Sequence, residues 1–115
     1  MAIVNITIEN DADFYRQFAY QLLDGTPISL AGNTLRMGIR HRAADRHEDL
    51  LLTTENGGLS IVDGPNGLFT VLITQDQLVH LPIGAYEHSL IRTISGGMQL
   101  RMWSGSLINN AGASR

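Results

Sequence analysis

The chain has 115 residues and a mass of 12.6 kDa, which is room for one domain around one hydrophobic core. It has no cysteine, so disulfides, thiolate metal sites and cysteine nucleophiles are excluded. The formal net charge is −3 and all 8 basic residues are arginine, which argues against sequence-independent nucleic-acid binding and leaves no lysine for Schiff-base or P-loop chemistry.

Turn signals divide the chain at short and fairly regular intervals. Groups of glycine, asparagine, aspartate and proline stand at 24–25, 32–33, 56–58, 63–67, 82–84 and 95–97. Glycine supplies the positive φ angles that tight turns need, and most of the 12 glycines stand in these groups. Short strands between turns, with no regular alternation of strand and helix, indicate an antiparallel β-sandwich or barrel.

The segments between the turns have the period-two alternation of half-buried strands. Leu35, Met37 and Ile39, for example, alternate with two arginines and a glycine, which places the arginines outside. Residues 68–74 are rich in β-branched, aliphatic and aromatic side chains, as in a central strand. The predicted strands cover residues 3–8, 35–40, 59–62, 68–74, 86–90 and 98–108, and we expect Gly105 to interrupt the last of them.

Residues 13–23 fit two structures. Phe14, Phe18 and Leu22 recur at helical spacing, but together with Tyr20 they also fall on one face of a strand. The aromatic content favours the strand, and the helix stays open as the alternative. A short helix is also indicated at 75–81, where Thr74 can cap one or two turns.

The chain shows no repeat and no linker. We therefore expect a single β-sandwich domain over residues 1–108, followed by a flexible C-terminal tail at 109–115 that is small and polar.

Residue types that bind metals gather only at 41–49. Two histidines, His41 and His47, stand there with Glu48 and Asp49, a combination that can ligate a divalent cation. The spacing matches no helical histidine pair, however, and two arginines in the same run would repel a cation. We interpret the run as a solvated hairpin tip, with a metal-dependent protein as the alternative hypothesis.

Three aromatic residues are candidate contacts with a partner or a ligand. Trp103 is the lone tryptophan, and Tyr15 and Tyr20 are further candidate stacking platforms. Ordinary packing in the sandwich is the competing interpretation of Trp103. His88 shares an apolar strand face with Tyr86, so we interpret it as a core or groove histidine with a satisfied hydrogen bond.

No combination of residues supplies a nucleophile, a base and an oriented partner. We therefore expect no enzyme, with no catalytic residue, cofactor or metal. The apolar stretches fall short of the roughly 18 residues of a membrane-spanning helix, and residues 1–5 lack the start of a secretory signal. We thus expect neither a membrane nor a nucleic acid as a partner.

Several motifs, taken in order, resemble one family. Residues 11–18 form an acidic and aromatic strand start, 24–27 an Asp-Gly-x-Pro turn, and 35–40 a strand that ends in Ile-Arg. A Leu-Pro-x-Gly-x-Tyr corner follows at 81–86, and a closing strand with a glycine near its end at 100–108. This order resembles small phage and prophage proteins with an immunoglobulin-like sandwich, akin to the N-terminal domain of baseplate upper proteins. The sequence departs from the family after the corner, where it has Tyr-Glu-His-Ser-Leu.

The resemblance implies an all-β, immunoglobulin-like antiparallel sandwich and carries over no catalytic residue. It further implies a structural or assembly module of a phage or prophage particle, in the tail or baseplate. Such a module would bind other phage structural proteins and copies of itself, and would stay in the host cytoplasm before assembly. The alternative is a ligand-binding sandwich, for carbohydrate or adhesion, that uses Trp103, Tyr15 and Tyr20.

Overall fold

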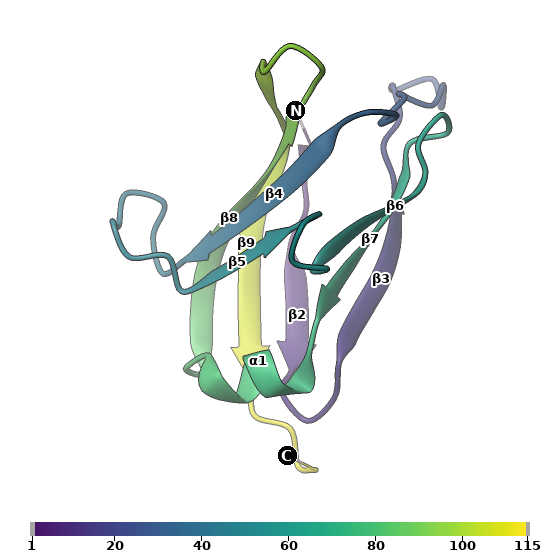
Figure 1. The fold of residues 1–115 in the computed structure, drawn as a ribbon. Coiled ribbons are helices and arrows are strands. Elements are labelled where there is room, and N and C mark those ends of the chain that lie inside the picture. The colour runs from purple at the N-terminus through teal and green to yellow at the C-terminus, as the bar shows by residue number, and fades with distance from the viewer. Residues whose placement is uncertain (1, 115) are drawn as a thin grey trace.

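The computed structural model describes residues 2–114 and shows two β-sheets packed face to face, with one short helix (Figure 1). The larger sheet has the order β1-β9-β8-β4-β5, with β2 also paired to β9, and the smaller has the order β3-β7-β6. The fold is therefore an immunoglobulin-like β-sandwich, as expected. Its elements are β1 (Ala2–Ile3), β2 (Ile6–Glu9), β3 (Phe14–Ala19), β4 (Thr34–Arg40), β5 (Leu50–Thr53), β6 (Leu59–Asp63), β7 (Leu68–Ile73), α1 (Gln75–His80), β8 (Gly84–Thr93) and β9 (Gln99–Asn110).

The predicted alternation places the core between the sheets. Leu35, Met37 and Ile39 of β4 are buried, while Arg36 on the same strand is exposed. Strand β7 is the central strand of its sheet, as its apolar run predicted. Pairing is antiparallel between β4, β5, β8 and β9, whereas β1 and β2 run parallel to β9.

Residues 14–19 form a strand, so the favoured interpretation of this segment is confirmed. Phe14 and Phe18 are half-buried and pack against the core. Between them, the guanidinium of Arg16 lies 5.3 Å and 5.9 Å from the centres of the two rings. The strand ends at Ala19, and the chain then turns, so Leu22 is exposed rather than part of the strand face.

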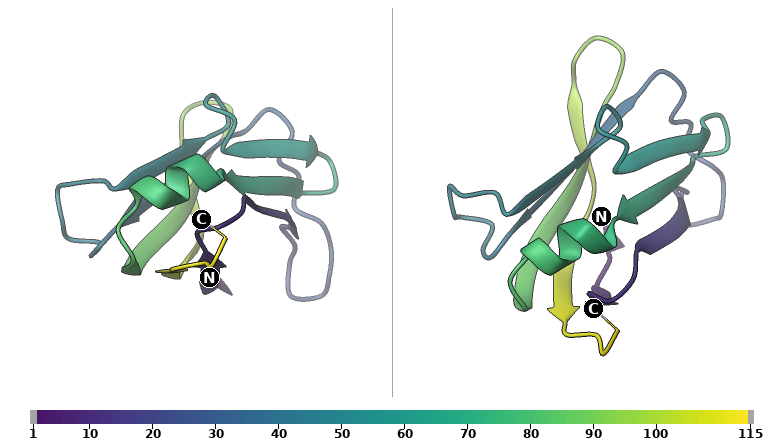
Figure 2. Two further views of the ribbon diagram at one scale, coloured as in Figure 1. Left: turned by 90° about the horizontal axis from the view of Figure 1, so that it is seen from below. Right: turned by 60° about the horizontal axis from the view of Figure 1, so that its bottom comes forward.

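Helix α1 connects β7 to β8 across one end of the sandwich (Figure 2). The predicted cap is present: the Thr74 hydroxyl accepts from the Gln77 amide, and the Gln77 side chain accepts from the Thr74 amide. Leu78 is fully buried beneath the helix. Within residues 2–114, no helix has the length and apolar character needed to cross a membrane.

Strand β9 extends beyond the predicted boundary at residue 108. Asn109 is fully buried, and its amide donates to the carbonyl oxygens of Leu78 at 3.2 Å and Leu81 at 2.9 Å. These bonds join the end of β9 to the end of α1. The first two residues of the predicted tail therefore belong to the sandwich, and the Gly112 amide also donates to the Asn10 side chain.

The expected interruption at Gly105 is wrong, because β9 is one continuous strand. The glycine instead allows two backbones to approach each other closely. A Cβ atom added at Gly105 would lie 1.9 Å from the carbonyl oxygen of Val4, which connects β1 to β2. Around this close approach the Val4 amide donates to Ser104 O at 2.9 Å, and Asn5 Oδ1 accepts from the Ser106 amide and hydroxyl. Only a residue without a side chain fits here.

We predict that Gly105→Ala lowers the free energy of unfolding by about 2–3 kcal/mol, because the new methyl group forces two backbones apart. Gly38→Ala, also in a strand, is the matched control. Its Cβ would meet only the end of the flexible Glu48 side chain, so its stability should stay within about 1 kcal/mol of the parent. Urea unfolding measures both variants. Equal stability of the two variants would contradict the close-approach interpretation.

Candidate functional site

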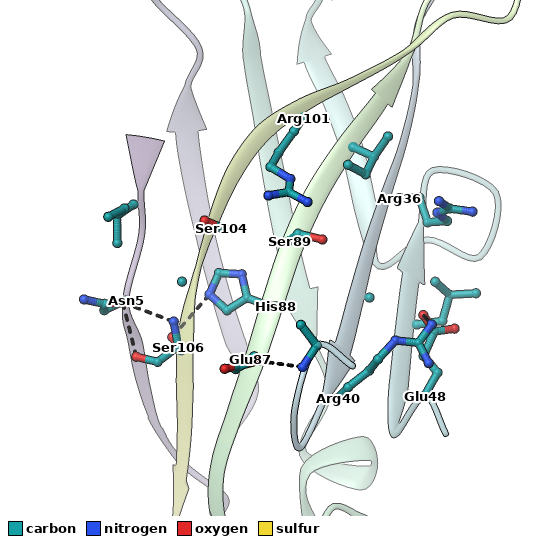
Figure 3. A pocket seen from close by; sticks show the side chains of 16 residues that line it. Asn5, Arg36, Arg40, Glu48, Glu87, His88, Ser89, Arg101, Ser104 and Ser106 are labelled. Carbon is teal, nitrogen blue, oxygen red and sulfur yellow. Dashed lines mark hydrogen bonds and ion pairs between the residues drawn. The ribbon is translucent and has the colours of Figure 1, made fainter. Parts of the chain in front are cut away.

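The outer face of the larger sheet is hollowed (Figure 3). The hollow measures about 730 Å³ and extends across β4, β8 and β9. Its floor consists of small residues, Gly38, Ser89 and Ser104, which lie side by side on three neighbouring strands. Outward-facing positions usually carry longer side chains, so three small residues in register leave a depression.

One end of the hollow carries two arginines without a partner. Arg36 and Arg101 both align with Ile91 of β8, so their guanidinium groups border the same part of the sheet (Figure 3). Neither side chain makes a hydrogen bond, ion pair or ring contact with any residue in the described part of the chain. Unpaired guanidinium groups are ready donors for carboxylate or phosphate oxygens.

The charges at the other end of the hollow are already satisfied. Arg40 contacts Glu48 at 3.3 Å and donates to the carbonyl oxygens of Asp45 and Arg46. The carboxylate of Glu87 accepts from the Ala43 amide and so holds the loop that follows β4. At one end of the hollow Arg40 and Glu48 pair while Glu87 keeps its negative charge, and at the other end Arg36 and Arg101 carry uncompensated positive charges.

His88 lies on the core side of the same sheet, as the sequence predicted. It is 4% exposed, its Nε2 lies 3.2 Å from Ser106 O, and its ring is 6.4 Å from that of Trp103. Burial lowers the pKa of His88, because the charged imidazolium loses its hydration, and the nearby carbonyls of Ser106 and Val4 only partly oppose this effect.

The three predicted contact residues do not come together. Trp103 is 5% exposed, with its ring centre 4.7 Å from Phe18 and 5.6 Å from Phe69, so the structure favours core packing for it over a surface platform. Tyr20 is half-buried, with the Arg92 guanidinium 5.3 Å from its ring centre. Tyr15 is 66% exposed on β3 in the other sheet, and remains a predicted contact residue.

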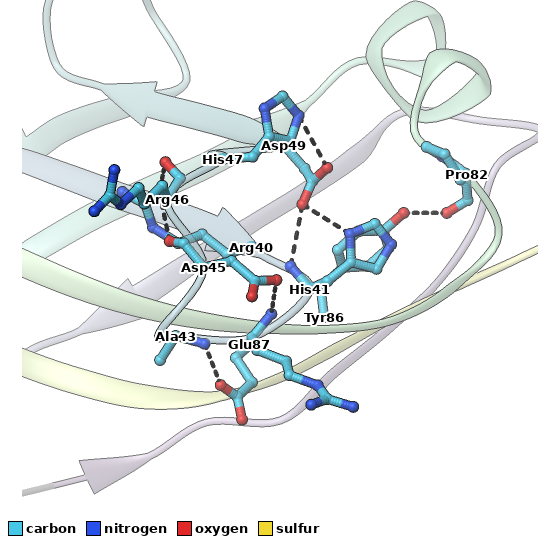
Figure 4. A network of polar contacts seen from close by, with 11 residues as sticks. Arg40, His41, Ala43, Asp45, Arg46, His47, Asp49, Pro82, Tyr86 and Glu87 are labelled. Carbon is cyan, nitrogen blue, oxygen red and sulfur yellow. Dashed lines mark hydrogen bonds and ion pairs between the residues drawn. The ribbon is translucent and has the colours of Figure 1, made fainter.

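The loop at 41–49 is organised by the Asp49 carboxylate (Figure 4). His41 Nδ1 lies 3.1 Å from one of its oxygens and His47 Nε2 lies 3.4 Å from the other. The His41 ring packs against Tyr86, whose hydroxyl donates to Pro82 O. Burial raises the pKa of the Tyr86 hydroxyl, and the Asp49 charge adds to this effect. The loop joins β4 to β5, as expected of a hairpin.

This network does not form a metal centre. Within residues 2–114, no three histidine or carboxylate side chains are grouped so that they could hold a metal ion. The two histidines share a single carboxylate, and they lie against it directly.

The hollow itself could not be found from the sequence. Its floor and its arginines come from strands far apart in the chain, and only the register of β4, β8 and β9 aligns them. The available signal was the Arg-x-Gly-x-Arg pattern of residues 36–40, which indicated only that the arginines face outward.

Comparison with known proteins gives a likeness of fold. No family model matches the chain, and no curated protein matches it. Among solved structures, the N-terminal domain of phage TP901-1 ORF48 has a TM-score of 0.52 at 15% identity, over 95% of this chain and 85% of that domain. Murine CRIg has a TM-score of 0.45 at 15% identity, over 94% of this chain and 92% of that chain. AggA, the major subunit of aggregative adherence fimbriae type I from Escherichia coli, has a TM-score of 0.39 at 13% identity, over 92% of this chain and 89% of that chain. The chain therefore shares its fold with the phage domain.

We predict that acidification destabilises the protein through His88. Its pKa is lower in the folded state than the ordinary 6.5, so below about pH 6.5 the unfolded chain binds more protons than the folded one. Stability should therefore fall as the pH drops through this window, by at most about 1.4 kcal/mol per pH unit from this residue. Urea unfolding over a pH series tests this. His88→Gln should flatten the dependence, whereas His80→Gln, an exposed control, should not. Equal pH dependence in the parent and His88→Gln would refute the assignment.

Proposed function

We propose that this chain is a non-enzymatic structural and assembly module of a phage or prophage particle, associated with the tail or baseplate. Its partners are other phage structural proteins and further copies of the chain, so it resides in the particle after assembly in the host cytoplasm. The observation that carries the proposal is the likeness of fold to the phage TP901-1 ORF48 domain, which extends over 95% of this chain.

The surface offers contacts suited to assembly. The sheet order leaves β5, β3 and β6 at sheet edges, where unpaired backbone groups can extend a sheet into a neighbouring chain. Apolar side chains on these strands are exposed, among them Tyr15 at 66%, Val62 at 57% and Leu51 at 37%. Exposed apolar and aromatic side chains beside a free edge support a role in protein–protein contacts.

The experiment is mass spectrometry of phage-like particles purified by density gradient from the organism that encodes the chain. We expect peptides of this chain in a fixed ratio to the other tail proteins, and a discrete oligomer of the isolated protein in light scattering. Absence from particles that contain the other tail proteins would overturn the proposed function. If light scattering finds only a monomer at high protein concentration, the proposal that the chain forms a homo-oligomer is overturned.

A further inference from the structure

We propose that the hollow on the outer face of the larger sheet binds the carboxylates of an extended acidic segment in a partner protein. Arg36 and Arg101 donate hydrogen bonds to the carboxylates, and the backbone of the segment lies on the floor of small residues. This inference rests on the proposed function, since it names the chemistry of one protein contact.

Four arginine side chains make no hydrogen bond, ion pair or ring contact within residues 2–114, and two of them, Arg36 and Arg101, line the hollow. Arg42 and Arg46 stand in the loop after β4 and do not line it. Arg16 and Arg92 lie over aromatic rings, and Arg40 is paired with Glu48. Arg36 and Arg101 have no such engagement with any residue from 2 to 114, although both border a concave surface. A planar guanidinium donates two parallel hydrogen bonds to a carboxylate, and such charge-assisted pairs are stronger than neutral hydrogen bonds.

The spacing of the two arginines defines the segment. They lie on β4 and β9, which flank β8, so their Cα atoms are about 10 Å apart at the usual strand separation. An extended chain advances about 3.3 Å per residue, so acidic residues two or three positions apart reach both guanidinium groups. Ile91 lies between the arginines and offers an apolar contact to the stems of the acidic side chains.

The negative groups of the hollow do not oppose this partner. Glu48 is neutralised by Arg40, and Glu87 is held by the Ala43 amide at the far end (Figure 3). The Ser89 and Ser104 hydroxyls on the floor make no hydrogen bond within residues 2–114 and can donate to a bound backbone. Glu87 keeps its charge but has a hydrogen-bond partner, so the groups of the hollow without any partner within residues 2–114 include the two guanidinium groups and the two serine hydroxyls.

Other occupants fit less well. Among residues 2–114, no phenylalanine, tyrosine or tryptophan lines the hollow, so this part of the chain offers it no aromatic stacking platform of the kind that sugar rings and unpaired bases use. The net charge of −3 would repel a nucleic-acid backbone outside the hollow. A protein segment with a few carboxylates matches both the small number of cations and the polar floor.

The probe is a short fluorescent peptide of alternating glutamate and glycine, with a glutamine–glycine peptide as the uncharged reference. In fluorescence anisotropy, we expect the parent protein to bind the glutamate peptide and not the reference. The double variant Arg36→Gln/Arg101→Gln should bind it about tenfold more weakly or worse, because two charge-assisted contacts are lost. The matched control, Arg16→Gln/Arg46→Gln, removes the same charge elsewhere and should bind within about twofold of the parent.

A second variant tests whether binding depends on the shape of the hollow. Ser89→Phe fills the floor without changing any charge, and should abolish binding while circular dichroism shows an intact sandwich. Lack of binding to the parent, equal weakening in both double variants, or unchanged binding in Ser89→Phe would each overturn the proposal. A labelled acidic oligosaccharide that competes for the hollow better than the peptide would also overturn it.

The two proposals fail separately. If the chain is present in particles but the peptide does not bind, the acidic-segment inference falls and the proposed function stands. If the peptide binds in the hollow but the chain is absent from particles, the proposed function falls instead.

Discussion

The backbone carbonyl of Val4 lies directly against Gly105, and the larger sheet depends on this close approach. It lets the first strands of the chain run parallel to the last one, while Asn5 replaces a backbone partner by accepting from the Ser106 amide and hydroxyl. Further along the chain, Ile6 and Ile8 enter the core. The first strands and the last strand are thereby held in one sheet, which gives the outer face of β8 and β9 a fixed shape.

That fixed shape sets the positions of the side chains on the outer face. The inward residues of β4, β8 and β9 form the core, whereas the outward residues are needed mainly for solubility. Small residues at Gly38, Ser89 and Ser104 open a hollow, and Arg36 and Arg101 remain unpaired beside it. Because neither arginine makes a hydrogen bond, ion pair or ring contact within residues 2–114, their charge is available to a partner. We propose that assembly into a particle uses this charge.

Local patterns predicted much of the fold, whereas the site needed long-range register. Alternation assigned the inward face of β4, and Thr74 was recognised as a helix cap, since both signals lie within a few residues. The spacing of Phe14 and Phe18 fits both a helix and a strand, so the segment is identified as a strand only by its pairing with β7. The roles of Gly105 and Trp103 were harder to predict, because the Val4 carbonyl and the rings of Phe18 and Phe69 come from distant segments. The hollow likewise exists only once three strands are aligned.

We propose that this chain is a particle component whose larger sheet faces a partner. Cryo-electron microscopy of the purified particle tests this proposal. We expect the sandwich to be visible in the tail or baseplate, with an acidic segment of a neighbouring protein lying across Arg36 and Arg101. A particle in which the sandwich is present but this face is open to solvent, or a particle without the chain, would contradict it.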